Sequence, residues 1–333
     1  MKPIIGITMG DGAGIGPEIV VKALNHPSVY EECAPLVIGD KKSLEKSLDI
    51  SKLGLKINVI DEVSQGVFSF GTIDVMDLDL LPEDLELGVV SPIAGDAAFQ
   101  YIVKAVELAK ENEIQAICTA PLSKEALHKG GHFYPGHTEI LAALTQTEDY
   151  SMMLTTPNLR VIHLTTHIGL IDAVKSITPK RTYSVIKLAY DTLRNAGISS
   201  PRIAVCGINP HAGEQGLFGY GEEEKQLLPG IEKAQQEGIE VFGPLPADTL
   251  FFRAVRGDFD MVVACYHDQG HTPVKAMSID DGVNITVGLK GGIIRSSVDH
   301  GTAFDIAGKN IASEGSLLAA LKSAVDLAPK NLP

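Results

Sequence analysis

The chain has 333 residues, of which 44% are hydrophobic and 5% aromatic, so it is long enough to bury a sizeable core in two domains or one large α/β unit. Its 42 Asp and Glu outnumber 28 Lys and Arg, and no basic cluster offers a surface for nucleic acid or an anionic membrane. No apolar run reaches the roughly 18 residues of a membrane span, and the N-terminus has no signal-peptide pattern. We therefore expect a globular cytoplasmic protein.

In chain order, β-rich runs alternate with helical patterns. The first strand is expected at 3–8, and others at 35–39, 116–120, 160–166, 202–208, 261–266 and 283–289. A helix is predicted over 97–112, where Phe99, Ile102, Val103, Val106 and Ala109 form one buried stripe. Thr178 and Pro179 are typical of a helix start, and Gly197 of its end. This alternation favours an α/β fold of parallel strands joined by helices, with ligands beyond the carboxyl ends of the strands.

Between the first strand and the next helix lies GDGAGIGPE, with glycines at 10, 12, 14 and 16. Backbone without Cβ atoms can turn tightly or approach a ligand. The segment does not match the dinucleotide pattern GxGxxG, and no lysine follows as in a phosphate-binding loop. Taken alone, a tight turn is at least as good an interpretation as a cofactor contact at Gly12 and Gly14.

Three of the predicted strands are followed by a histidine. The run at 160–166 leads to His167, the run at 202–208 leads to His211, and the run at 261–266 leads to His267. A single such histidine is usually a hydrogen-bonded loop residue, but the ends of parallel strands lie side by side in one sheet. Three imidazoles would suit a catalytic divalent cation, with Asp248 or Asp268 as a fourth ligand or a supporting carboxylate. Imidazole ligands leave the metal's identity open.

Longer motifs carry a family resemblance. GDGAGIGPE and HGTAFDIAGKNIA (300–312) resemble the two ends of the β-decarboxylating dehydrogenases, which include isocitrate and isopropylmalate dehydrogenases. The middle of the chain is similar to the 4-hydroxythreonine-4-phosphate dehydrogenase (PdxA) family, and its motifs there are YPGHTEI (134–140), TTH (165–167), NPHAGEQGLFG (209–219), PLPADTLF (244–251), YHDQGH (266–271), DGVNIT (281–286) and RSSVDHGTA (295–303). TAPLSKEALHKGGHFYPGHTEI (119–140) and NPHAGEQGLFG are more similar to the branch that oxidises 4-phospho-D-threonate and 4-phospho-D-erythronate.

The resemblance implies a two-domain fold like that of isocitrate and isopropylmalate dehydrogenases, with α/β/α layers and a cleft between domains. A cofactor-side domain would comprise 1–135 and 297–333, and a metal-binding and dimerisation domain would comprise 136–296. The implied metal ligands are His167, His211 and His267, which in the family meet at the interface of a homodimer. The implied substrate-binding residues are His137, Thr138, Lys275, Asn284 and Arg295. The implied cofactor-binding residues are Gly12, Gly14, His300, Gly301, Thr302, Ala303 and Asp305.

The implied reaction is an NAD-dependent oxidation at C3 of a small 4-phosphorylated hydroxy acid, aided by one divalent cation (Zn, Mg, Mn or Co). Decarboxylation of the resulting keto acid then gives dihydroxyacetone phosphate. Lys275 and Asp248 are the candidates for the catalytic proton acceptor. The alternative substrate is 4-hydroxythreonine-4-phosphate itself, of pyridoxal phosphate biosynthesis. A metal-dependent hydrolase or aldolase is an alternative of another class, against which the HGTAFDIAGK segment argues. A non-catalytic binding protein for sugar acids is a further alternative, but it would need neither metal ligands nor a cofactor loop.

Some positions carry a second interpretation. Thr138 could simply cap a helix beginning at Glu139, and Lys275 could be a solvated surface residue. His271 could orient Asp268 or lie in solvent. The connection KGGIIR before Arg295 is about two residues longer than in relatives of this type, so its glycines could reshape the pocket or form an outward turn.

Overall fold

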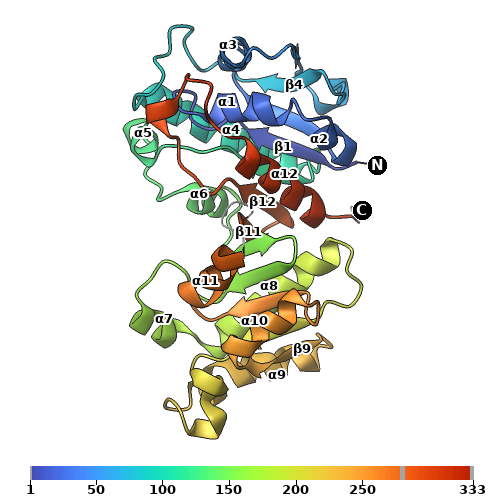
Figure 1. Ribbon diagram of the computed structural model, residues 1–333, viewed down its shortest axis with the longest axis vertical. Helices are drawn as coiled ribbons and strands as arrows, with labels where there is room; N and C mark the ends of the chain where they lie inside the picture. The colour runs from blue at the N-terminus through green and yellow to red at the C-terminus, as the bar shows by residue number, and fades with distance from the viewer. Residues whose placement is uncertain (1, 278–281, 331–333) are drawn as a thin grey trace. The chain divides into compact units, whose positions relative to one another are not determined.

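The computed structural model describes residues 2–277 and 282–330, which leaves out Asp281 of the DGVNIT motif. The chain divides into two compact units (Figure 1). The first comprises Met1–Glu148 and Leu289–Ala328, and the second comprises Asp149–Gly288 with a short stretch from Pro329. The first unit thus draws on both parts of the chain. It also holds residues 136–148 and 289–296, which the sequence analysis assigned to the metal-binding domain.

The first unit contains a parallel sheet with the strand order β3-β4-β2-β1-β5-β12. Its strands are β1 (Ile4–Thr8), β2 (Ala34–Gly39), β3 (Lys56–Val59), β4 (Thr72–Asp77), β5 (Ala116–Thr119) and β12 (Ile293–Ser297). Strands β2, β1 and β5 are buried almost throughout, as is usual when helices cover both faces of a parallel sheet. Strand β12 enters this sheet from the C-terminal part of the chain and pairs with β5.

The helices of the first unit are α1 (Gly16–Ala23), α2 (Pro27–Glu32), α3 (Lys41–Ser51), α4 (Pro92–Lys110), α5 (Lys124–Lys129), α6 (His137–Leu144) and α12 (Gly315–Leu327). Ser91 caps α4 by accepting a hydrogen bond from the N–H of Ala94. The predicted stripe on α4 is partly wrong, because Phe99 and Val103 are only half-buried. The ring of Phe99 instead stacks on that of His132, with centroids 3.8 Å apart.

The second unit contains a mixed set of strands in the order β11-β6-β7-β10-β8-β9. These are β6 (Ser151–Thr156), β7 (Leu159–His163), β8 (Ile203–Cys206), β9 (Val241–Leu245), β10 (Met261–Ala264) and β11 (Val283–Leu289). Strand β6, which was not among the predicted strands, departs from the expected parallel arrangement, because it runs antiparallel to both β7 and β11. Only Pro157 and Asn158 separate β6 from β7, and so short a connection can join only antiparallel strands.

The helices of the second unit are α7 (Leu170–Ser176), α8 (Pro179–Asn195), α9 (Leu228–Gln236), α10 (Ala247–Val255) and α11 (His267–Met277). The predicted start of α8 is confirmed, since the Thr178 hydroxyl accepts a hydrogen bond from the N–H of Arg181. Gly197 follows the helix with φ of +96°, a left-handed conformation that favours glycine.

All seven predicted strands are present, within three residues at each end. The four cysteines are buried and form no disulfide. In the described part of the chain, no helix combines the length and the apolar character that a membrane crossing requires.

Candidate active site

The three strands that lead to the predicted metal ligands are neighbours. Strand β10 pairs in parallel with β7 on one side and with β8 on the other. Their carboxyl ends therefore lie along one edge of the sheet, where the chain continues to His267 from β10, His167 from β7 and His211 from β8. The structure confirms the predicted adjacency of these strands.

Two of the three histidines approach each other. The ring centroids of His167 and His267 are 5.6 Å apart, with 47° between the ring planes. They line a pocket of about 400 Å³ together with Asp268, Tyr266 and the segment from Thr166 to Leu170. His167 is exposed and His267 half-buried, so both rings are accessible from this pocket.

Asp268 fixes the proton of the His267 ring. Nδ1 of His267 lies 2.7 Å from Oδ1 of Asp268, and a carboxylate can only accept, so the imidazole donates from Nδ1. The unprotonated Nε2 of His267 is then left as a potential ligand. A carboxylate behind the ring is the usual support of a metal-binding histidine. This contact matches the supporting role considered for Asp268, whereas Asp248 is exposed in the first turn of α10.

His211 lies in a separate turn of the second unit. Residues 211–215 all have left-handed φ values, including 54° at His211, and the His211 ring lies 6.0 Å from that of Phe218. The buried Glu223 carboxylate holds this turn by accepting from the N–H groups of Ile208 and Asn209 at 2.9 and 2.7 Å. Within residues 2–277 and 282–330 of this single chain, no three His, Cys, Asp or Glu side chains gather as a metal site. The three-histidine centre therefore stays a prediction.

The strand ends are tied together by a residue that the sequence analysis did not single out. The Gln269 side chain accepts a hydrogen bond from the Cys265 N–H and donates one to the Gly207 carbonyl, each at 2.7 Å. It thereby links the end of β10 to the end of β8. Gln269 belongs to the YHDQGH motif, so its position between His267 and His271 in the sequence is the signal that could have identified it.

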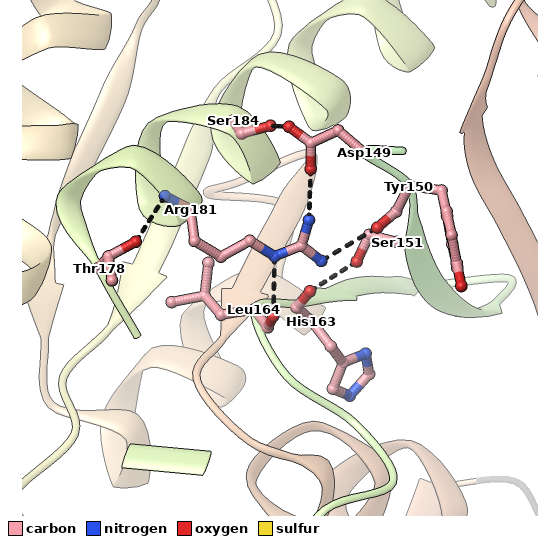
Figure 2. Close-up of polar contacts among 8 residues, drawn as sticks. All are labelled: Asp149, Tyr150, Ser151, His163, Leu164, Thr178, Arg181 and Ser184. Carbon is pink, nitrogen blue, oxygen red and sulfur yellow. Dashed lines mark hydrogen bonds and ion pairs between the residues drawn. The ribbon is translucent and has the colours of Figure 1, made fainter. Parts of the chain in front are cut away.

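Arg181 of α8 supports the end of β7 (Figure 2). Its guanidinium donates to the Leu164 carbonyl at 3.0 Å, to the Tyr150 carbonyl at 3.0 Å and to Asp149 at 2.7 Å. Leu164 directly precedes the TTH segment, so these bonds hold the chain where it leaves the sheet toward His167. No sequence motif pointed to Arg181.

His271 has neither of the roles that the sequence analysis considered for it. It is half-buried one turn after His267, and its ring stacks on that of His267 with centroids 3.6 Å apart. Its Nδ1 faces Nε2 of His163 and the His267 carbonyl rather than Asp268. Lys275 follows one turn later and is half-buried, and Asn284 lies half-buried on β11.

The remaining substrate-binding candidates lie in the first unit. Arg295 on β12 is 4% exposed, and its Nε and Nη2 donate to the Thr119 hydroxyl at 3.0 and 2.6 Å. Burial lowers the pKa of Arg295 to about 10, so the side chain stays cationic at neutral pH. Burial, reinforced by the charge of Arg295, also lowers the pKa of His137 well below its usual value. Nε2 of His137 is buried and has no hydrogen-bond partner among the residues that the structure describes.

The structure distinguishes the two interpretations of Thr138 and of the long connection before Arg295. Helix α6 begins at His137 after the N-cap Gly136, so Thr138 lies inside the helix and does not cap it. In the long connection before Arg295, Lys290, Gly291 and Gly292 are exposed and form a tight turn with a Gly292 N–H to Leu289 carbonyl bond of 3.1 Å. The extra residues therefore form an outward turn.

The two cofactor-associated motifs meet in the first unit. The Ile15 N–H donates to the Thr302 carbonyl at 3.0 Å, and a Cβ atom at Gly14 would lie 2.8 Å from that same oxygen. Gly14 is therefore required for the close approach of the segment that carries His300, Gly301, Ala303 and Asp305. Gly12, Gly14 and Gly308 line a pocket of about 340 Å³ beside α1 and α3.

The GDGAGIGPE segment also carries a buried acid. Asp11 is fully buried, and its Oδ1 accepts from the Ala13 N–H at 2.9 Å. Burial raises the pKa of Asp11 to about 6. Since this pKa exceeds that of the unfolded chain, the protonated form favours folding, and its contribution is lost as pH rises from about 4 through about 6.

We expect the loss of stability that follows ionisation of Asp11 to be measurable by comparison with the uncharged variant Asp11→Asn. Between about pH 4 and about pH 7, the free energy of unfolding of the wild type should fall relative to that of Asp11→Asn by up to about 3 kcal/mol. Urea unfolding of both proteins across this range measures the difference. A difference that is independent of pH would show that Asp11 has an ordinary pKa.

Comparison with known proteins identifies the family. The model of the family described as pyridoxal phosphate biosynthetic protein PdxA matches residues 31–324. The chain belongs to the PdxA family. A curated relative, the D-threonate 4-phosphate dehydrogenase of Cupriavidus necator, is 59% identical over 328 residues, which are 98% of each chain.

Solved structures of the PdxA family agree over the whole length. A 4-hydroxythreonine-4-phosphate dehydrogenase from Burkholderia phymatum has a TM-score of 0.96 and 60% identity, covering 99% of this chain and 100% of the other. A 4-hydroxythreonine-4-phosphate dehydrogenase from Klebsiella pneumoniae has a TM-score of 0.93 and 46% identity, covering 99% of each chain. The predicted α/β fold and the assignment as a dehydrogenase, with its NAD-type cofactor, are confirmed at the level of the family.

Proposed function

We propose that this chain is an NAD-dependent and divalent-metal-dependent dehydrogenase that oxidises C3 of 4-phospho-D-threonate or 4-phospho-D-erythronate. The keto acid then loses CO2 to give dihydroxyacetone phosphate. The observation that carries the proposal is the paired His167 and His267, 5.6 Å apart at one sheet edge with Asp268 behind the second ring. The D-threonate 4-phosphate dehydrogenase of C. necator, 59% identical over nearly the whole chain, supports the choice of substrate.

The residues present fit a divalent cation. His267 has its proton fixed on Nδ1 by Asp268, which leaves Nε2 unprotonated toward a ligand, and His167 and His211 are exposed at the same sheet edge. A bound cation would supply Lewis-acid stabilisation of the substrate's hydroxyl oxygen as the hydroxyl loses its proton and C3 loses a hydride. The protein's own part is to hold the His267 ring in the orientation that Asp268 sets.

The substrate is anionic, whereas the protein carries a formal charge of −14, so recognition requires local cations. Arg295 is such a cation. It is buried, and its charge acts on the His137 imidazole, whose Nε2 lacks a partner in the described part of the chain. We assign His137, Thr138, Lys275, Asn284 and Arg295 to substrate binding. Charge-assisted bonds from Arg to phosphate or carboxylate are the strongest available for this purpose.

Lys275 is the better candidate for the proton acceptor. It lies two turns after His267 in the same helix, α11, and residues at this spacing share one face. It is half-buried, whereas Asp248 is exposed. In its unprotonated form, the lysine amine would take the proton of the C3 hydroxyl.

For the cofactor, we assign the loop from His300 to Asp305 and the glycines 12 and 14 to NAD. Bound there, NAD would supply the hydride acceptor for the oxidation at C3. The close packing of Gly14 on Thr302 supports this assignment, because it brings the two motifs into one surface with the neighbouring pocket of about 340 Å³.

We further propose a homodimer whose interface includes the metal site. Apolar side chains beside the pocket are unusually exposed, namely Ile168 at 51%, Leu170 at 60% and Ile171 at 71%. Near His211, Leu217 is 70% exposed and Tyr220 is 88% exposed. A second copy of the chain would cover these side chains and bring further ligands to the metal.

The assay that tests the function is NADH formation by the purified protein with each phosphorylated acid. We expect NADH with 4-phospho-D-threonate or 4-phospho-D-erythronate in the presence of Mg, Mn, Co or Zn. EDTA should abolish it, and added metal should restore it. A larger kcat/KM with 4-hydroxythreonine-4-phosphate would favour the alternative substrate. Absence of NADH with all three compounds would refute the assignment, and turnover without NAD would instead indicate a hydrolase or aldolase.

A further inference from the structure

Behind the His167 and His267 pair lies a buried histidine that no motif explains. His163 on β7 is 0% exposed, and its Nδ1 lies 3.2 Å from the Met152 carbonyl. Burial lowers the pKa of His163 to about 3, so the ring is neutral and carries one proton. A carbonyl can only accept, so that proton is on Nδ1 and Nε2 of His163 is an acceptor.

This acceptor determines the proton position on the next ring. Nδ1 of His271 lies 3.2 Å from Nε2 of His163 and 3.1 Å from the His267 carbonyl. Both neighbours are acceptors, so Nδ1 of His271 is the donor. In the neutral ring, Nε2 of His271 is therefore unprotonated.

The His271 ring in turn contacts His267, the proposed metal ligand. The His271 ring stacks on the His267 ring at 3.6 Å between centroids, with only 13° between the planes. His267 is thus held by Asp268 at Nδ1 and by the face of His271. The three rings form a continuous column from the sheet to the pocket, which we call the imidazole column (His163, His271 and His267).

The backbone of the YHDQGH motif is adapted to this column. A Cβ atom at Gly270 would lie 2.2 Å from Nε2 of His163 and 2.9 Å from Cγ1 of Val161. Only glycine lets α11 approach β7 closely enough for the bond between His163 and His271. The His163 backbone is also anchored, because its carbonyl accepts from the Ser151 hydroxyl at 2.5 Å, and its ring points away from Arg181 (Figure 2).

We propose that His163 is a positioning residue, which acts through His271 to hold the His267 ring with its unprotonated Nε2 available to the metal. The inference rests on the proposed function in taking His267 as a metal ligand. Losing such supporting contacts typically weakens metal binding by about 10- to 100-fold.

The experiment compares three variants of the full-length protein with the wild type. His163→Leu fills the site without an acceptor, and His163→Gln restores an acceptor near the position of Nε2. Thr182→Val is the matched control, because it removes a buried hydrogen bond of the same unit, from Thr182 to the Gln226 carbonyl at 3.0 Å, away from the column. Thermal unfolding of all four proteins measures their stability.

Two readouts decide the proposal. In the metal-free wild type, 15N NMR of labelled histidine should show His163 and His271 protonated at Nδ1 only. Titration with Co2+ should give a dissociation constant about 10- to 100-fold higher for His163→Leu, with most of the affinity restored in His163→Gln and no change in Thr182→Val.

Other outcomes overturn it. An Nε2-protonated His271 in the wild type contradicts the assigned hydrogen bonds. Equal Co2+ affinity of His163→Leu and the wild type removes His163 from the support of the site, although the proposed function would stand. A wild type that binds no Co2+ while the NMR shows the expected proton positions refutes His267 as a ligand, and with it the proposed function.

Discussion

Replacing His267 with alanine is expected to lower kcat/KM for NADH formation by at least about 1000-fold. A catalytic cation contributes several kcal/mol of transition-state stabilisation, and each factor of ten corresponds to about 1.4 kcal/mol. A site that loses one of three ligands holds its metal poorly. The fold should persist, because His267 is a half-buried residue in the first turn of α11. Steady-state kinetics, metal analysis and circular dichroism of the variant measure these effects.

His211→Ala should behave in the same way if the predicted three-histidine centre is correct. His26→Ala is the control, since His26 lies in the other unit and pairs with Glu314 at 3.0 Å. A His267→Ala variant that keeps both its activity and its metal would show that the pair with His167 has no catalytic role. Loss of activity in His26→Ala as well would indicate a general effect of histidine removal on the fold.

Replacing Arg295 with methionine is expected to lower kcat/KM for the phosphorylated acid by about 100-fold, mainly through a higher KM. The side chain is 4% exposed and its charge has no neighbouring carboxylate in hydrogen-bond contact among the described residues, only the Thr119 hydroxyl. A hydrogen bond to a charged group contributes about 1.5–3 kcal/mol, and a buried cation gains most from an anionic ligand. Kinetics with 4-phospho-D-threonate and with unphosphorylated D-threonate measure the effect.

Comparing the two acids shows which group of the substrate Arg295 binds. If Arg295 binds the phosphate, its loss should affect the phosphorylated acid far more than the unphosphorylated one. Thr119→Val is the matched variant, since it removes the hydroxyl that holds Arg295 but keeps the cation, and we expect a change in KM of less than about tenfold. Equal loss with both acids in Arg295→Met would assign the side chain to the carboxylate or to the fold.

The strands that the sequence predicted are those with long β-branched runs, such as β1, β7 and β10. Strand β4 was not predicted because two acids, Asp74 and Asp77, interrupt the apolar residues of Thr72–Asp77. Its Asp74 is nonetheless 1% exposed, since it accepts from the Val67 and Phe68 N–H groups and from Asn58. A carboxylate becomes acceptable in a core only through partners that the fold supplies, and a local pattern does not reveal them.

In the candidate site, too, local sequence patterns could be predicted, whereas partners that the fold brings together could not. The histidines at 167, 211 and 267 could be predicted because each follows a strand whose apolar residues are visible in the sequence. These strands, β7, β8 and β10, are neighbours in the sheet. The partnership of His163 with His271 could not be predicted, because it joins residues 108 positions apart through a single ring contact. Arg181 gave no signal either, because its main partners are backbone carbonyls, which every residue possesses.

The insertion of β12 beside β5 has a consequence for synthesis on the ribosome. Residues 1–148 emerge first, but β5 keeps one row of N–H and C=O groups unpaired until residues 293–297 have been translated. The nascent N-terminal portion thus presents an open sheet margin during most of translation, and open margins of this kind promote association between chains. Premature termination before residue 293 would leave that margin permanently bare, so truncated products should aggregate or be degraded rather than persist as half-size proteins.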